Sequence, residues 1–115
     1  MRNLVVTPIL LLALAGSAMA IDLAPLWDFS KPDVSEQRFR QALQGATGDD
    51  ALILKTQIAR TFGLRGNFDG ARAVLHEVEP AVAAAGPEAR VRYHLEMGRS
   101  YASAAHKPEL LTDEA

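Results

Sequence analysis

Large apolar residues recur at helical spacing along most of this chain, and this periodicity restricts the fold more than any other feature of the sequence. Leu54, Ile58 and Phe62 are each four residues apart, which places them on one face of a helix. No segment alternates apolar and polar residues as a half-buried strand does, and Ala, Leu, Arg, Glu and Gln, which favour helices, dominate the sequence. The sequence therefore predicts an all-α fold of antiparallel helix hairpins.

Glycine and proline mark the ends of four expected helices. The segment Gly63–Asn67 reads as a short turn in which a glycine takes the left-handed conformation of a helix C-terminus. Pro87 suits the first turn of the last helix, because a backbone N–H at that position would have no hydrogen-bond partner within the helix and proline lacks this N–H. The expected helices cover about residues 33–44, 49–64, 68–85 and 88–104.

Acidic residues indicate how two of these helices begin, and one proline indicates where the third is interrupted. Asp33 and Glu36 have the spacing of a capping box at the start of the first helix. Asp49 or Asp50 is expected to cap the second helix. Pro80 removes a hydrogen bond within the third helix, so a kink or a break is expected just before it.

Each helix is expected to turn one apolar face toward the core. The periodicity assigns to these faces Val34, Phe39, Ala42 and Leu43 in the first helix, Ala51, Leu54, Ile58, Ala59 and Phe62 in the second, Ala71, Leu75, Val78 and Val82 in the third, and Val91, Leu95, Gly98 and either Tyr101 or Ala102 in the fourth.

The first twenty residues have the order of a secretory signal peptide: a basic start, an apolar run from Leu4 to Ala15, and small residues up to Ala20. The apolar run is shorter than the ~20 residues that a membrane-spanning helix needs. Ser17 stands where a lipoprotein would need its lipid-bearing cysteine. We therefore expect cleavage after Ala20, a periplasmic or secreted product, no lipid anchor and no stable membrane insertion.

Residues 21–32 then form an irregular lead-in whose aromatic residues, Trp27 and Phe29, are expected to pack onto the first helix. The helical domain covers residues 33–115. The sequence has no cysteine, so its apolar core must hold the fold without disulfides. Its net charge of −2 gives no basic surface of the kind that nucleic acid binding needs, so nucleic acid is excluded as a partner.

The sequence repeats itself at the scale of a helix hairpin. The segment Ala59–Phe62 recurs thirty-nine residues later as Gly98–Tyr101, with a small residue, an arginine, a hydroxyl residue and an aromatic residue in the same order. Ser35, Phe39 and Ala42 have the same spacing as the triplet 71, 75 and 78. Repeats of this length, in which small residues let helices approach closely, are typical of helical solenoids.

At these positions the sequence resembles the tetratricopeptide repeat family. The best-matching unit is about residues 52–85, in which Lys55 replaces the signature tryptophan and Val78 replaces an alanine. The next unit keeps Gly98 and Tyr101 but departs from the signature at Ala105, Lys107 and Leu110. The resemblance implies a short α-solenoid of about one and a half to two repeats, and a generic antiparallel helical bundle is the alternative. The matching positions are Ile58, Ala59, Phe62, Gly66, Phe68, Ala71 and Leu75.

Catalytic and metal-binding motifs are not supported by the sequence. The histidines His76, His94 and His106 lie on separate expected elements. His76 and Glu77 match the first two residues of a zinc metalloprotease motif, but Pro80 occupies the position where the motif needs its second histidine. We therefore expect a protein without enzymatic activity, metal or cofactor.

The resemblance implies that the first helix of each hairpin lines a concave groove for a peptide or partner helix. Arg60 and Arg99 occupy the same place in successive units, and two guanidinium groups on one surface suit a carboxylate. The alternative is that each arginine pairs with a nearby acid such as Glu96 or Asp28. The implied groove residues are Ile53, Thr56, Arg60, Gly63 and Leu64 in one unit, and Arg92, Leu95, Arg99, Ala102 and Ser103 in the next.

Two functions remain open from the sequence. The first is an exported protein–protein interaction module that binds a protein or peptide in the groove. The second is a self-associating structural bundle of the cell envelope, for which a homodimer is expected. A solenoid needs about three units, and the fourth helix here is followed only by residues 106–115, in which Leu110 and Leu111 could begin a covering helix.

Overall fold

The computed structural model describes residues 21–105, and within this range it contains helices and no strand, which confirms the all-α prediction. The expected signal peptide and the segment with Leu110 and Leu111 lie outside the described residues. No helix within residues 21–105 has the length and apolar character needed to cross a membrane. The elements are the 3-10 turn η2 (Ala24–Leu26) and the helices α2 (Pro32–Leu43), α3 (Gly48–Leu64), α4 (Phe68–Val82) and α5 (Pro87–Ala105).

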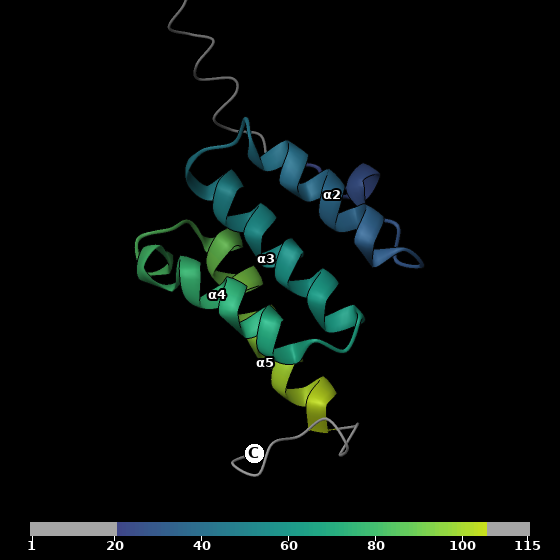
Figure 1. Ribbon diagram of the computed structural model, residues 1–115. Helices are drawn as coiled ribbons and strands as arrows, with labels where there is room; N and C mark the ends of the chain where they lie inside the picture. Colours follow the sequence, from purple (N-terminus) through teal and green to yellow (C-terminus); the bar gives the residue numbers. More distant parts are fainter. Residues whose placement is uncertain (1–20, 106–115) are drawn as a thin grey trace, which may run out of the picture.

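Helix α3 is the centre of the arrangement. It contacts α2, α4 and α5, whereas α2 contacts only α3 and the turn η2. Figure 1 shows α2, α3 and α4 side by side, with α5 packed behind α3 and α4. The core follows this order, because the most deeply buried large residues are Phe39 from α2, Leu54 and Ile58 from α3 and Leu75 from α4.

Helix α4 follows its expected pattern closely. Ala71, Leu75, Val78 and Val82 are all buried, so its inward face is confirmed. Of the kink or break expected just before Pro80, the break is wrong, because α4 continues through this residue to Val82. The proline lies close to the helix end and removes only one backbone donor, while buried valines on both sides of it hold the last turn in place.

The turn between α3 and α4 confirms the predicted left-handed glycine, which is Gly66 with φ 82°. The cap that follows was not predicted. The Asn67 side chain accepts a hydrogen bond from the backbone N–H of Gly70 at 2.8 Å and so caps α4. A Cβ atom on Gly70 would lie 2.7 Å from both the Asn67 amide nitrogen and the Phe62 ring, so this glycine makes room for the cap.

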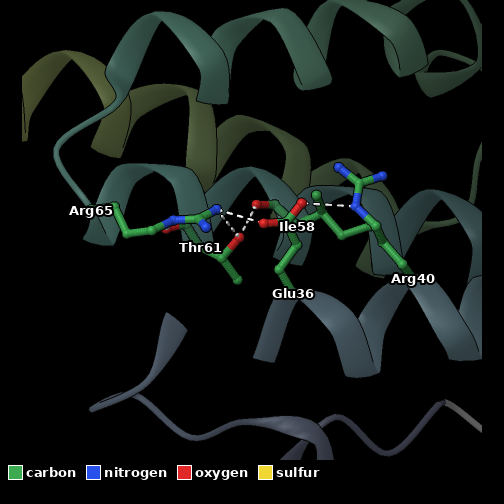
Figure 2. A network of polar contacts seen from close by, with 5 residues as sticks. All are labelled: Glu36, Arg40, Ile58, Thr61 and Arg65. Carbon is green, nitrogen blue, oxygen red and sulfur yellow. Dashed lines mark hydrogen bonds and ion pairs between the residues drawn. The ribbon is translucent and has the colours of Figure 1, made fainter. Parts of the chain in front are cut away.

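The predicted capping box of α2 is wrong. The helix begins one residue earlier, at Pro32, so its N-cap residue is Lys31, whose side chain makes no capping hydrogen bond. Glu36 instead accepts from Arg40 Nε and from Arg65 Nη2, both at 2.7 Å (Figure 2). Arg65 also donates to the backbone oxygen of Thr61, so the network joins α2 to the end of α3.

The predicted cap of α3 by Asp49 or Asp50 is also wrong. The Asp49 carboxylate reaches across the fold and accepts from the backbone N–H of Gly86 at 2.8 Å. A Cβ atom on Gly86 would lie only 2.6 Å from the same carboxylate oxygen, so a larger residue there would displace the Asp49 side chain from this position. Asp49 therefore ties the start of α3 to the turn that precedes α5.

The predicted inward face of α5 is wrong. Val91, Leu95, Gly98, Tyr101 and Ala102 are all exposed. The buried residues of α5 lie on the opposite face, and two of them are polar: Glu96 is paired with Arg99, and the Ser100 hydroxyl donates to the Met97 carbonyl. Because these polar groups have partners, α5 can bury them and leave an apolar stripe in solvent. The inward residues of this helix are Ala89, Tyr93, Glu96 and Ser100.

Candidate binding site

A small hollow of about 240 Å³ opens between the end of α3, the start of α4 and the last turns of α5. We call it the arginine hollow. Its volume is below the ~300 to 1,000 Å³ of typical small-molecule pockets, so it is sized for one or two side chains. Apolar residues provide most of its surface, and charged side chains lie between them. It is lined by Ala59, Arg60, Gly63, Leu64, Phe68, Ala71, Glu96, Arg99 and Ser100.

The internal repeat of the sequence builds the two walls of this hollow. Thr61 on α3 and Ser100 on α5 occupy equivalent places, and each donates its hydroxyl hydrogen to the carbonyl three residues earlier, at 2.6 and 2.7 Å. Arg60 and Arg99, the residues just before them, both line the hollow. The repeat therefore brings two equivalent arginines to one surface.

Arg60 is the most unusual residue of the site. Its guanidinium carbon lies 5.5 Å from the centre of the Trp27 ring and 5.1 Å from the centre of the Phe29 ring. Within residues 21–105 this group makes cation–π contacts but no hydrogen bond or ion pair. Burial and then the charge of Arg99 lower the pKa of Arg60. An arginine stays charged even so, and its donors remain available for an acceptor.

Glu96 and Arg99 form the polar part of the hollow. Arg99 Nη1 donates to Glu96 Oε2 at 2.7 Å, and the glutamate is only 4% exposed. Burial raises the pKa of the Glu96 carboxyl, and the charges of Arg99, Arg60 and Arg92 oppose this shift only in part. Of the two pairings considered from the sequence, the one between Arg99 and Glu96 is present. Asp28 accepts hydrogen bonds from Ser30.

The lead-in supplies an aromatic platform that sequence reasoning did not assign to the site. Trp27 and Phe29 stack with ring centres 4.4 Å apart and planes 8° from parallel. The predicted packing onto the first helix is confirmed for Trp27, whose ring meets Phe39 edge-on at 4.9 Å. Phe29 remains 55% exposed beside Arg60. The spacing of the two aromatics, one residue apart before the first helix, was the available signal.

A buried series of polar side chains holds this platform on α3. Trp27 Nε1 donates to Gln57 Oε1 at 3.0 Å, and Gln57 Nε2 donates to Thr56 Oγ1 at 3.2 Å. The Thr56 hydroxyl in turn donates to the Ile53 carbonyl. The lead-in is thereby fixed against the helix that carries Arg60.

The other predicted groove residues do not lie on one common surface. Ile53 and Thr56 are buried below the surface, so they do not line a groove. Gly63 and Leu64 line the hollow. Arg92 pairs with Glu88, Leu95 and Ala102 lie on the exposed face of α5, and the side chain of Ser103 lies outside the described part.

Metal chemistry has no support in the described part of the protein, where no three His, Cys, Asp or Glu residues are grouped to hold an ion. No protein-family model, curated protein or solved structure matches the sequence.

Proposed function

We propose that this protein is an exported, non-enzymatic interaction module that binds a carboxylate-bearing segment of a partner protein in the arginine hollow. One observation carries the proposal. The guanidinium of Arg60 is positioned by two aromatic rings and lines the hollow beside Arg99, yet within residues 21–105 no acceptor satisfies it. A carboxylate from outside would complete its hydrogen bonding.

The charges around the hollow favour an anionic ligand. Arg60, Arg92 and Arg99 all act on the buried carboxyl of Glu96, which leaves an excess of positive charge at this place. Arg92 is balanced by Glu88, and Arg99 by Glu96, so the excess is concentrated on Arg60. An acidic side chain or the terminal carboxylate of a peptide would bring the matching charge.

A tetratricopeptide-like solenoid is the arrangement that we propose for the helices. Two features support it. Helix α3 contacts each of the next two helices, as the first helix of a hairpin does when the following hairpin stacks on it. Arg60 and Arg99, thirty-nine residues apart, line the same hollow, as equivalent positions of two successive units would.

Export to the periplasm or the exterior follows from the signal-peptide pattern of residues 1–20. The partner is then an exported protein or peptide. Binding through charge-assisted hydrogen bonds and one apolar side chain requires no catalytic group, which agrees with the proposal of a non-enzymatic module.

The experiment is a binding titration with matched synthetic peptides. A panel of short peptides with a free C-terminal carboxylate or acidic side chains is compared with the same peptides in carboxamide form. We expect the carboxylate peptides to bind, and the double variant Arg60→Ala, Arg99→Ala to weaken binding about tenfold or more. Arg38→Ala, which removes an exposed arginine of α2, is the matched control.

The outcomes separate clearly when circular dichroism shows that the double variant keeps its helices. Carboxylate binding that the double variant loses and the Arg38 variant retains supports the proposal. Equal binding by wild type and the double variant would overturn it, as would equal binding of carboxylate and carboxamide peptides.

A further inference from the structure

The outer face of α5 carries an apolar stripe in solvent. Val91 is 64% exposed and Leu95 is 45% exposed, and Gly98 follows on the same side of the helix. The steps of four and three residues between them are those of a seam between two helices. A shallow depression lined by Pro87, Arg90, Val91, His94 and Leu95 adjoins this α5 outer face.

The equivalent face of α3 is covered by helices. Val91, Leu95 and Gly98 lie thirty-nine residues after Leu52, Thr56 and Ala59. Thr56 and Ala59 are buried, and Ala59 lines the arginine hollow together with residues of α5. The repeat thus places on α5 a surface whose counterpart on α3 is occupied by neighbouring helices.

Two arginines flank the stripe. Arg99 lies on the side of the arginine hollow, and Arg90 lies on the other side. Within residues 87–102 there are two carboxylates. Glu88 is paired with Arg92 at 2.9 Å, and Glu96 is buried. The α5 outer face therefore combines an apolar centre with basic edges.

We propose that the α5 outer face docks an amphipathic helix of a partner protein whose apolar stripe is flanked by Asp and Glu. Leucine-like side chains pack on Val91 and Leu95, and the bare backbone at Gly98, where an added Cβ would meet nothing, allows close approach. The acidic flanks pair with the arginines at the edges. Arg99 belongs to both surfaces, but the apolar stripe lies outside the arginine hollow, and the inference does not depend on carboxylate binding there.

A second copy fits the face less well than an acidic partner. It would bring the same basic edges against each other, and like charges at an interface are repulsive. Residues 106–115 follow α5 in the sequence, and their removal in the test below shows whether they cover this face.

The test uses the full-length protein and two synthetic helical peptides of about twenty residues, long enough to form several helical turns. Both carry the same leucine stripe, and one is flanked by Glu and the other by Lys. We expect the Glu peptide to bind and the Lys peptide not to bind. Binding of the Glu peptide should weaken in about 1 M salt, where charges are screened within ~3 Å.

The protein offers a matched pair of variants. Leu95 on the α5 outer face is 45% exposed, so Leu95→Ser removes apolar contact surface there, whereas Leu95→Met keeps an apolar side chain of similar volume at the same place. We expect Leu95→Ser to weaken binding of the Glu peptide about tenfold and Leu95→Met to leave its affinity nearly unchanged. Circular dichroism checks that both variants remain helical.

Four results would overturn the inference. The first is equal binding of both peptides, and the second is unchanged binding of the Glu peptide in Leu95→Ser. The third is a concentration-dependent dimer in light scattering that Leu95→Ser dissociates, which would make a second copy the occupant. The fourth is binding of the Glu peptide only after removal of residues 106–115, which would make that segment the occupant.

Discussion

The hydrogen bond between Trp27 and Gln57 allows a quantitative test of how the lead-in is held. Trp27→Phe keeps an aromatic ring against Phe29 and Phe39 but removes the indole N–H that donates to Gln57 at 3.0 Å. Gln57→Leu removes the acceptor and replaces it with an apolar side chain of similar volume. Each single variant leaves one partner of the pair without its hydrogen bond.

The expected magnitude follows from burial. Gln57 is 1% exposed, so its carbonyl cannot turn to water when the indole is lost. A buried group left without its partner costs about 1 to 3 kcal/mol, and we expect Trp27→Phe to lower the free energy of unfolding by about 2 kcal/mol. Gln57→Leu should cost about 1 kcal/mol, because the half-buried indole N–H can partly reach water.

The double variant is the decisive measurement. Since it removes both partners, its loss should be about 1 kcal/mol smaller than the sum of the two single losses. The free energies come from urea unfolding followed by far-UV circular dichroism, because Trp27 is the single tryptophan of the sequence and the variant has no tryptophan fluorescence. Val82→Ala combined with Trp27→Phe is the additive control. Losses that add to within about 0.3 kcal/mol for Trp27 and Gln57 would refute the reasoning.

Three further predictions concern charge and turn geometry. Burial raises the pKa of Glu36, but the hydrogen bonds from Arg40 and Arg65 outweigh burial, so the pKa of this carboxyl is lowered. The stability that the carboxylate contributes is therefore lost as pH falls through its folded pKa. Acid unfolding of Glu36→Gln, followed by circular dichroism, should lack this loss. The pKa of Glu96 is raised by burial, so Glu96→Gln should be more stable than wild type at pH 7, and urea unfolding should show the difference shrinking as pH falls through the folded pKa; a less stable variant at pH 7 would contradict this sign. Gly66→Ala should cost about 1 to 2 kcal/mol in thermal unfolding because of its left-handed backbone, and equal unfolding temperatures for wild type and variant would contradict this.

The helices themselves could be predicted because they depend on local periodicity. All four were expected within a few residues of their observed ends, and the buried face of α4 was assigned correctly. The face of α5 was not, because Glu96 and Ser100 are buried through partners, among them Arg72, which donates to the Ser100 carbonyl from another helix. A periodicity in one helix carries no information about such partners.

The errors at the helix starts have the same physical origin. Glu36 and Asp49 have the spacing or position of capping residues, but each makes a long-range contact, to Arg65 and to the Gly86 backbone respectively. A local motif states which bonds a side chain could make, and the tertiary fold decides which it does make.

The candidate site was partly visible in the sequence. The repeat predicted that Arg60 and Arg99 are equivalent, and both line the hollow. The aromatic support of Arg60 was not predicted, because Trp27 and Phe29 lie about thirty residues away in sequence and reach it through a segment without periodicity.

The central position of α3 has a consequence for how the molecule opens. The lead-in and α2 are attached to the rest of the fold only through α3, so they can detach while α3, α4 and α5 stay packed. Such partial opening would remove the aromatic platform from Arg60 without unfolding the hollow. Amide hydrogen exchange should therefore be faster in the lead-in and α2 than in α3, and a ligand held by Arg60 should slow exchange in the lead-in most of all.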